Sequence, residues 1–488
     1  MNIKNLTTMP LHFVRGRKNV FLDWQFIEPG YGIPFWKFYQ EKHGLLPWLS
    51  PYGIELKVMR PEISVEPFVQ NDPLGFIGAY STLIHEDGLY RLWYATYDFN
   101  EKGQEFDKLC YMESSDGKNW RRSQLGLYPY KGSKDNNIVY GLGPKECGGH
   151  IGAHGATVFI DPYAIPEERY KMVHLGPSDR NATLSNWLYG ATSHDGIRWN
   201  TLPEPILKYT SDTQSIGLFD EEIGKYVIYL RGWSPQNRYG SGGRRMIRRT
   251  ESSDFRRFPP PKPLISHNPS WGVHTDIYTN SYHKWPGADN AHIMLPALYH
   301  RDTDTVDVHL ALSRDANEWF LPQSRPLISN EDRPDKITIY TGSGIVPYGK
   351  DLWAFPVFFS RRAHNEYTDE RPALYLATIR QDGLIAVESN LKGEFYTYPC
   401  IFDGSSLNLN AVSYTGGEIK VEILQVKPAL ELSPIEGFTL DLCDRITGSA
   451  LWQMVSWRGN PDISTLAGRI LRFRFVLVRS RLHAFRFE

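Results

Sequence analysis

Ser114-Ser115-Asp116-Gly117-Lys118-Asn119-Trp120 is the stretch that decides the fold, because the chain repeats it. The pattern of serine, aspartate and closing aromatic residue returns at 193–199, 252–258 and 313–319, and a weaker fifth copy lies at 378–384. In such a phrase the serine and aspartate side chains accept the amide protons of a turn, glycine supplies a positive φ, and the aromatic residue anchors the returning strand. The phrase therefore predicts one tight hairpin turn in each repeated unit.

The spacing of the copies indicates the size of the unit. Successive aspartates are roughly 60 to 80 residues apart, which is longer than a compact propeller repeat but suits one sheet with long loops. Ser-Asp-Gly turns are common in β proteins, yet four copies with an aromatic residue in register favour a true repeat. Five copies predict five blades. The expected fold class is all-β, with a five-bladed β-propeller followed by a β-sandwich.

Each unit carries the same order of strands. In the first unit, the apolar runs 79–84 and 89–95 flank a Glu86-Asp87-Gly88 turn, and a further run at 108–113 leads into the repeated phrase. Two apolar runs on either side of such a turn predict a hairpin of buried strands. Each unit therefore reads as two hairpins, or four strands.

The chain is expected to divide into three parts. Residues 1–70 are irregular and rich in Pro, Gly and aromatic residues, and we expect them to pack along the blades or to close the ring, because open sheet edges are a liability. Residues 71–390 form the predicted propeller. From 391 to 488 the phrase is absent, and the period-two alternation at 418–424 predicts a separate sandwich with one buried face and one wet face.

Composition excludes several classes of partner. A net charge of -1 argues against a nucleic acid or a membrane surface, and an aromatic content of 14% is compatible with flat or sugar-like ligands. The four cysteines have no Cys-x-x-Cys spacing and are expected to be free thiols. No apolar run has the length of a signal peptide or of a membrane span, so a cytoplasmic location is expected, or a periplasmic or secreted one if a leader was trimmed. The sequence leaves open whether the protein forms a homo-oligomer.

The candidate site residues follow from propeller geometry. The innermost strand of each blade starts near the axis, so the residues just before these strands converge on one pocket. Glycoside hydrolysis needs one carboxylic acid for the leaving oxygen and one carboxylate as nucleophile or base. The predicted catalytic carboxylates are Asp72, Glu146, Asp212 and Asp276. The predicted substrate-binding residues are His154, Arg231, Trp233, His274, Tyr340 and His364.

Each candidate has a structural alternative. Asp212 and Asp72 lie beside turn-forming residues and could cap turns, and a lone histidine such as His154 is more often structural than a ligand. Clustered carboxylates and histidines could also hold a cation. No His-Glu-x-x-His or comparable spacing supports a metal site, so neither a metal nor a cofactor is expected.

The chain resembles the five-bladed propeller glycosidases of the β-fructosidase superfamily, glycoside hydrolase family 32 in particular. The resemblance rests on Asn71-Asp72-Pro73 followed by the strand at 90–94, on the phrase at 193–199, and on residues 451–487. It covers most of residues 70 to 488. It implies a propeller with an appended sandwich and an activity on a glycosidic bond.

The resemblance also implies roles for single residues. In that family the nucleophile belongs to an Asn-Asp-Pro motif, which corresponds to Asp72. The acid belongs to a Glu-Cys motif, for which Glu146-Cys147 is the counterpart. The Arg-Asp-Pro motif that stabilises the transition state has Ile160-Asp161-Pro162 as its counterpart, in which the arginine is missing.

Two classes of function follow from these residues. The first is a glycoside hydrolase that cleaves a bond in an oligosaccharide, with a furanoside favoured by the resemblance. The alternatives are a carbohydrate-binding propeller without catalysis and a glycoside phosphorylase. Carboxylates about 5 to 10 Å apart would favour hydrolysis. A ring of Arg and His with only one carboxylate would favour phosphorolysis or binding.

Overall fold

The computed structural model describes residues 9–30, 50–99, 105–141, 153–177, 186–235, 243–366, 371–426 and 432–488. The described elements are β-strands, apart from short 3-10 turns at Pro166–Glu168 (η3), Pro269–Trp271 (η4) and Ser464–Leu466 (η6). Within these ranges no helix is long and apolar enough to cross a membrane. The chain splits into two compact units. The small unit comprises Met1–Met59, Trp285–Ala291 and Arg380–Glu488, and the large unit comprises Arg60–Lys284 and His292–Ile379.

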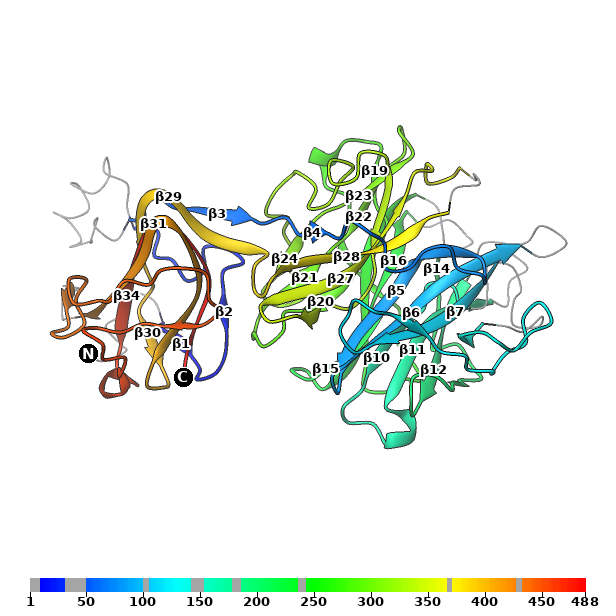
Figure 1. Ribbon diagram of the computed structural model, residues 1–488, viewed down its shortest axis with the longest axis horizontal. Coiled ribbons are helices and arrows are strands. Elements are labelled where there is room, and N and C mark those ends of the chain that lie inside the picture. Colours follow the sequence, from blue (N-terminus) through cyan, green and yellow to red (C-terminus); the bar gives the residue numbers. More distant parts are fainter. Residues whose placement is uncertain are drawn as a thin grey trace. The chain divides into compact units, whose positions relative to one another are not determined.

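The large unit begins with three antiparallel sheets, each made from one continuous stretch of chain (Figure 1). The first contains β5 (Phe76–Glu86), β6 (Leu89–Phe99), β7 (Glu105–Ser114), β8 (Arg121–Arg122) and β9 (Ile138–Tyr140). The second contains β10 (Thr157–Ile160), β11 (Tyr170–Pro177), β12 (Asn186–Ser193), β13 (Asn200–Thr201) and β14 (Leu207–Ser211). The third contains β15 (Ile216–Asp220), β16 (Lys225–Ser234), β17 (Arg244–Ser252) and β18 (Lys262–Ile265).

The rest of the large unit forms an eight-stranded and a three-stranded sheet. The eight-stranded sheet contains β19 (Thr275–Ile277), β22 (Ala297–His300), β23 (Thr305–Val308), β25 (Thr338–Thr341), β26 (Val346–Tyr348), β27 (Leu352–Ser360), β28 (Ala373–Arg380) and β4 (Glu62–Ile63). The three-stranded sheet contains β20 (Tyr282–Lys284), β21 (His292–Met294) and β24 (Ala311–Ser313). A parallel contact between Val306 and Thr338 joins the fourth and fifth predicted units. Four sheets therefore have four or more strands each, and a separate fifth blade stays a prediction.

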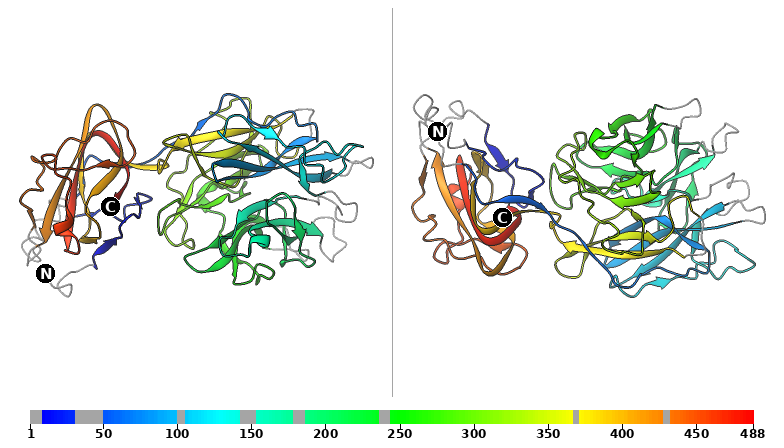
Figure 2. Two further views of the ribbon diagram at one scale, coloured as in Figure 1. Left: turned by 60° about the horizontal axis from the view of Figure 1, so that its bottom comes forward. Right: turned by 90° about the horizontal axis from the view of Figure 1, so that it is seen from above.

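Buried side chains join each of these four sheets to the next. Figure 2 shows the sheets of the large unit from two further directions. Aliphatic and aromatic residues on the facing strands form one cluster at each junction, which removes their apolar surface from water. The clusters contain, in order, Trp93 with Met172, Val173 with Leu230, Tyr229 with Ile277, and Phe358 with Tyr94. The last cluster returns to the first sheet and closes the ring. The large unit is therefore an all-β, propeller-like arrangement.

The repeated phrase forms the predicted turn between the third and fourth strands of a sheet. In the second copy, the Ser193 hydroxyl accepts hydrogen bonds from the amides of Asp195 (3.2 Å) and Gly196 (2.9 Å). The Asp195 carboxylate accepts bonds from the amides of Ile197 (2.9 Å) and Arg198 (2.8 Å). Gly196 has a φ of 73°. The prediction of one hydrogen-bonded turn per phrase is confirmed for this copy.

Gly196→Ala is expected to destabilise the protein more than the same change in an open turn. A Cβ at position 196 would lie 2.7 Å from Cζ2 of the buried Trp93, whereas nothing lies within 4 Å at Gly224, which has a similar φ of 63°. Both alanines incur about 1 to 2 kcal/mol of backbone strain, and Gly196→Ala adds about 1 to 3 kcal/mol of overpacking. Urea unfolding measures both losses. Equal losses would contradict this packing.

The small unit contains one nine-stranded sheet. Its strands are β1 (Leu11–Phe13), β2 (Asn19–Val20), β3 (Glu55–Val58), β29 (Ile385–Tyr396), β30 (Cys400–Phe402), β31 (Leu407–Val426), β32 (Leu432–Pro434), β33 (Gln453–Met454) and β34 (Leu471–Phe487). The long strands β31 and β34 pair antiparallel along most of their length, with register shifts where bulges occur. A second, separately packed layer of a sandwich stays a prediction.

The N-terminal strands differ from what the sequence predicts. We expected residues 1–70 to pack on the propeller, but β1 pairs with β30, β2 with β34 and β3 with β29, all within the small unit. Only β4 joins the large unit, where it pairs with β28. The physical reason is that β29, β30 and β34 have edges whose backbone groups need partners, and the N-terminal strands supply them. The exact domain limits at 70 and 390 stay predictions.

Candidate functional site

A cavity of about 640 Å³ lies in the large unit where the first strands of the sheets begin. Its wall includes Tyr80 of β5, His154 just before β10, Asp212 just before β15 and Tyr340 of β25. The aromatic side chains of the wall are Tyr80, Tyr97, Trp233, Tyr278, Tyr340 and Phe358. The charged and polar ones are Asp107, His154, Asn186, Asp212, Arg245, Arg301, Thr338, Arg362, His364 and Asn365. Such a mixed lining is typical of small-ligand sites.

Of the ten site residues that the sequence predicts, the structure places five on the wall of this cavity. Asp212, His154, Trp233, Tyr340 and His364 all line this cavity. The predicted Arg231 lies directly behind its wall, with an exposed fraction of only 2%. Of the predicted positions before first strands, His154 and Asp212 line the cavity, whereas Asp72 and Asp276 do not.

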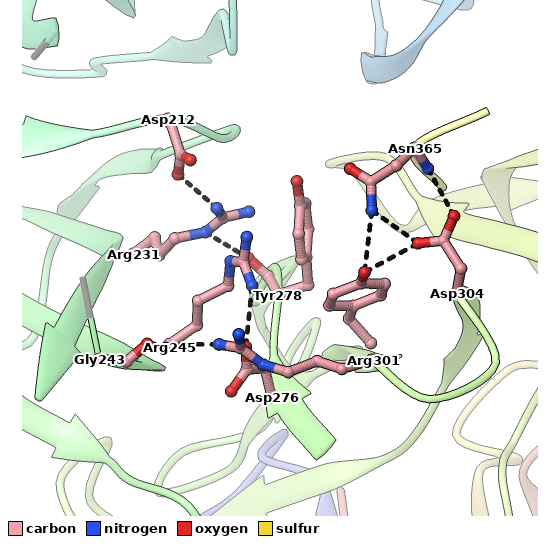
Figure 3. A network of polar contacts seen from close by, with 10 residues as sticks. Asp212, Arg231, Gly243, Arg245, Asp276, Tyr278, Arg301, Asp304 and Asn365 are labelled. Carbon is pink, nitrogen blue, oxygen red and sulfur yellow. Dashed lines mark hydrogen bonds and ion pairs between the residues drawn. The ribbon is translucent and has the colours of Figure 1, made fainter. Parts of the chain in front are cut away.

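Asp212 is the most accessible of the predicted carboxylates that the structure describes, since its side chain is 39% exposed. Its Oδ1 lies 2.5 Å from Nη1 of Arg231 (Figure 3). The contact is an ion pair between the carboxylate and the guanidinium group. Arg231 is fixed from its other side, because Nε donates to the carbonyl of Tyr278 at 3.1 Å and the guanidinium lies 3.7 Å from the ring centroid of that residue.

The electrostatics of Arg231 follow from this arrangement. Burial by itself would lower the pKa of the guanidinium, but the carboxylate of Asp212 and the hydroxyls of Tyr278 and Tyr80 outweigh it and hold the pKa above its ordinary value. Arg231 is therefore a permanent positive charge beneath Asp212. This positive charge forms an ion pair with the Asp212 carboxylate at the cavity wall.

A second carboxylate of the wall belongs to a histidine pair. Oδ2 of Asp107, which is buried, lies 2.7 Å from Nδ1 of His154. Nε2 of the same histidine lies 3.3 Å from the backbone carbonyl of Asp212. The imidazole is thereby held between the two aspartate positions, and its edge meets the ring of Tyr80 at a centroid distance of 5.3 Å. Asp107 and the Asp212 carbonyl therefore fix the orientation of the His154 imidazole on the cavity wall.

Asp72 lies outside the cavity lining, and its carboxylate stabilises a turn. Its Oδ1 accepts a hydrogen bond from the amide of Leu74 at 2.9 Å, and its Oδ2 accepts one from the Tyr94 hydroxyl at 2.7 Å. Nε of Arg122 lies 3.2 Å from the same oxygen. Asp72 is 1% exposed and does not line the cavity. Its carboxylate is fully used by local partners, so its position does not suit the nucleophile that the resemblance implies.

Asp276 is buried beneath the cavity wall. Its Oδ2 accepts hydrogen bonds from Nη1 of Arg245 and from Nε of Arg301, both at 2.9 Å (Figure 3). It is 0% exposed and does not line the cavity, in contrast to the predicted catalytic position. The physical reason is that two arginines from neighbouring strands cover it. His274 is exposed and also lies outside the lining, and Glu146 falls outside the described residues.

His364 is a neutral member of the wall. Burial lowers its pKa to about 4, and the nearby charges of Arg231 and Arg245 act in the same direction. Its Nδ1 lies 2.9 Å from the Tyr340 hydroxyl. Burial also raises the pKa of that hydroxyl well above its ordinary value. At neutral pH this pair is therefore uncharged and offers hydrogen bonds rather than charge.

The depressed pKa of His364 predicts a dependence of stability on pH. The unfolded chain binds this proton near pH 6.5, whereas the folded protein binds it only near pH 4, so protonation favours unfolding. The free energy of unfolding is therefore expected to fall as the pH falls from 6.5 towards 4. His174 and His283, with pKa values lowered by burial to about 4 and about 3, act in the same sense.

His364→Gln is expected to reduce the pH dependence of the free energy of unfolding by the contribution of one proton, which is up to about 1.4 kcal/mol per pH unit. The free energy of unfolding, measured in urea from pH 7 to 4.5, gives the slope for each variant. The control is His194→Gln, whose side chain is 60% exposed. Identical slopes in wild type and His364→Gln would contradict the burial of a neutral imidazole.

Sequence reasoning did not find Asp107, Arg245 and Arg301. Asp107 lies on β7 and Arg245 on β17, which are third strands of their sheets, and Arg301 directly follows β22. A rule that considers only the start of each first strand cannot reach them. One signal was present, because Arg245 follows a Gly-rich segment, and loops on rigid scaffolds often build sites.

The described residues give no direct sign of a metal site. No group of three or more His, Cys, Asp or Glu side chains is placed to hold an ion in the part of the chain that the structure covers. Cys110, Cys400 and Cys443 are free and buried.

No protein-family model matches this chain, and no curated protein sequence is significantly similar to it. Solved structures are similar in fold. A chain described as a glycoside hydrolase is 15% identical with a TM-score of 0.44, over 71% of this chain and 95% of that one. The α-L-arabinofuranosidase of Podospora anserina in complex with cellotriose is 11% identical with a TM-score of 0.43, over 66% and 98%.

A third similar structure is described under the family of mannoside phosphorylases that contains glycoside hydrolases targeting β-1,2 mannosidic linkages in Candida mannan. It is 14% identical with a TM-score of 0.42, over 74% of this chain and 96% of that one. Likeness at this level concerns the fold alone. What this chain does must be argued from its own cavity.

Proposed function

We propose that this protein is a carbohydrate-active enzyme that cleaves a glycosidic bond of an oligosaccharide in the cavity of the large unit. The observation that carries the proposal is the state of Asp212, a partly exposed carboxylate on the cavity wall that is paired with the buried Arg231. A carboxylate at this place on the cavity wall can act as the nucleophile or activate water. The aromatic side chains beside it offer flat faces against which sugar rings pack.

The second group that glycosidic cleavage needs is a proton donor. Asp107 and His154 form the second titratable pair of the described wall, and His154 lies beside Asp212. We assign the proton transfer to this pair or to Glu146, which the sequence places in the segment before His154. Hydrolysis of a furanoside is the specific activity that the resemblance implies, and it is part of this proposal.

The alternatives have support of their own. A phosphorylase is favoured by one observation, namely that arginines line the same cavity as Asp212. A carbohydrate-binding propeller without catalysis would need the aromatic wall but no proton donor.

A screen of the purified protein separates these functions. It uses aryl furanosides, aryl pyranosides and plant or algal oligosaccharides, each with and without inorganic phosphate. We expect release of a reducing sugar from at least one class of glycoside. Release only with phosphate, as a sugar phosphate, would identify the phosphorylase. Binding without any product across the whole panel would overturn the enzyme proposal in favour of the binding protein.

A further inference from the structure

Part of the cavity wall is a cluster of arginines, here called the arginine cluster and defined as Arg231, Arg245 and Arg301. Arg245 and Arg301 line the cavity, with side chains 22% and 40% exposed, and Arg231 lies behind them. Figure 3 shows the three guanidinium groups on the same side of Tyr278 as Asp212 and Asp276. Positive charge is therefore concentrated at one place in a site that otherwise suits a neutral sugar.

The two arginines that line the cavity have one carboxylate partner between them. Arg245 and Arg301 share a single buried carboxylate, that of Asp276, through Oδ2. Two guanidinium groups carry two positive charges and one carboxylate carries one negative charge, so one positive charge is not neutralised within this group of three side chains. Asp212 is paired with Arg231, and Asp107 lies against His154, which carries a charge only when it is protonated. Among the described residues, Asp276 is the carboxylate that pairs with Arg245 and Arg301.

The cluster also has donors without acceptors. Nη2 of Arg231 and Nε of Arg245 are buried and have no hydrogen-bond partner in the described structure. Both guanidinium groups lie against the ring of Tyr278, at 3.7 Å and 5.0 Å from its centroid. Buried donors on charged groups are costly when they stay unpaired. The repulsion between these two like charges is offset in part by the carboxylates of Asp212 and Asp276.

We propose that the arginine cluster is an oxyanion-binding subsite, filled either by the carboxylate of a uronic acid residue in the substrate or by inorganic phosphate. The inference rests on the proposed function, which it deepens by naming an acidic substrate or co-substrate. Planar guanidinium groups with several N–H donors match carboxylate and phosphate oxygens, often through two parallel hydrogen bonds. A neutral sugar hydroxyl would leave the excess charge of the cluster unpaired.

The two occupants have different consequences for the reaction. A carboxylate would orient an acidic sugar ring beside Asp212 and would take no part in bond breaking. Phosphate would be a reactant: one of its oxygens forms a bond to the anomeric carbon as the glycosidic C–O bond breaks. The departing oxygen takes a proton from a carboxylic acid of the cavity, and the proton of the phosphate hydroxyl restores that acid.

Isothermal titration of the full-length protein tests the subsite without any turnover. The probes are inorganic phosphate, glucuronate and galacturonate, with glucose and galactose as neutral controls. We expect phosphate or a uronate to bind at least about tenfold more tightly than the neutral sugars, which is the effect of one charge-assisted contact. Phosphate alone would identify a co-substrate site, and a uronate alone would identify an acidic sugar.

Arginine variants test whether the anion binds at the arginine cluster. Arg245→Gln is expected to weaken the favoured anion by about 10- to 100-fold. Arg301→Gln, at the more exposed position, should do the same and serves if Arg245→Gln unfolds. The matched control is Arg249→Gln on the same strand, since Arg249 pairs with Glu251 and does not line the cavity.

Equal affinity for anions and neutral sugars would overturn the subsite, and so would equal losses in Arg245→Gln and Arg249→Gln. Failure of the proposed function would look different, because glycosides would remain uncleaved whatever the anion affinity. The titration therefore judges the subsite independently of the activity screen.

Discussion

Replacement of Asp212 by asparagine is expected to lower the turnover number on a cleaved glycoside by about 10² to 10⁴, the contribution of a positioned acid, base or nucleophile. Asparagine keeps the shape of the side chain but can neither hold a negative charge nor transfer a proton. Affinity for the sugar should change little, because the aromatic wall remains. Initial rates at saturating glycoside, together with a binding titration, separate these two effects.

The design needs two controls. Asp212→Asn removes the counter-charge of the buried Arg231, so some loss of stability is expected and rates must be measured where circular dichroism shows a folded protein. Asp254→Asn changes an exposed aspartate in the third copy of the repeated phrase and should leave turnover unchanged. A variant Asp212→Asn with turnover close to wild type would remove Asp212 from the chemistry.

Asp276→Asn is expected to have the largest effect on stability, a loss of about 3 to 5 kcal/mol. Asp276 is fully buried, and its carboxylate accepts hydrogen bonds from both Arg245 and Arg301. Asparagine would leave the guanidinium groups of Arg245 and Arg301 without their shared counter-ion at a position that is itself fully buried. Urea or thermal unfolding of the purified variant measures the loss.

The matched control for this change is Asp335→Asn. Asp335 pairs with Arg361 at 2.8 Å, but both side chains are about half exposed, at 49% and 63%. An exposed pair contributes about 0 to 1 kcal/mol. Equal losses in the two variants would show that Asp276 is not the buried counter-ion that the structure places there.

The fold could be predicted as far as local sequence controls it. The Ser-Asp-Gly turns form as predicted, because each depends on side chains only two or three residues from the amides they accept. The joining of the fourth and fifth units could not be predicted, because the contact of Val306 with Thr338 links strands that are distant in sequence. The pairing of the N-terminal strands within the small unit is likewise a long-range contact without a local signal.

The candidate site also contains residues that the sequence alone could predict and residues whose position depends on contacts with other strands. Asp212 and His154 were predictable because they directly precede first strands, and chain direction alone brings such residues to the axis. Asp276 starts β19, yet whether its carboxylate faces the cavity or lies beneath it depends on Arg245 and Arg301, which come from other strands. Asp72 matches a family motif, but its hydrogen bonds to Leu74 and Tyr94 hold it away from the cavity.

A crystal structure of the Asp212→Asn variant with a glycoside that the wild type cleaves tests the central claim most directly. The account predicts a sugar ring in the cavity, packed against its aromatic wall, with the reacting carbon or the glycosidic oxygen within about 3.5 Å of the side chain at position 212. A glycoside bound on another surface, with the cavity occupied only by solvent, would contradict it.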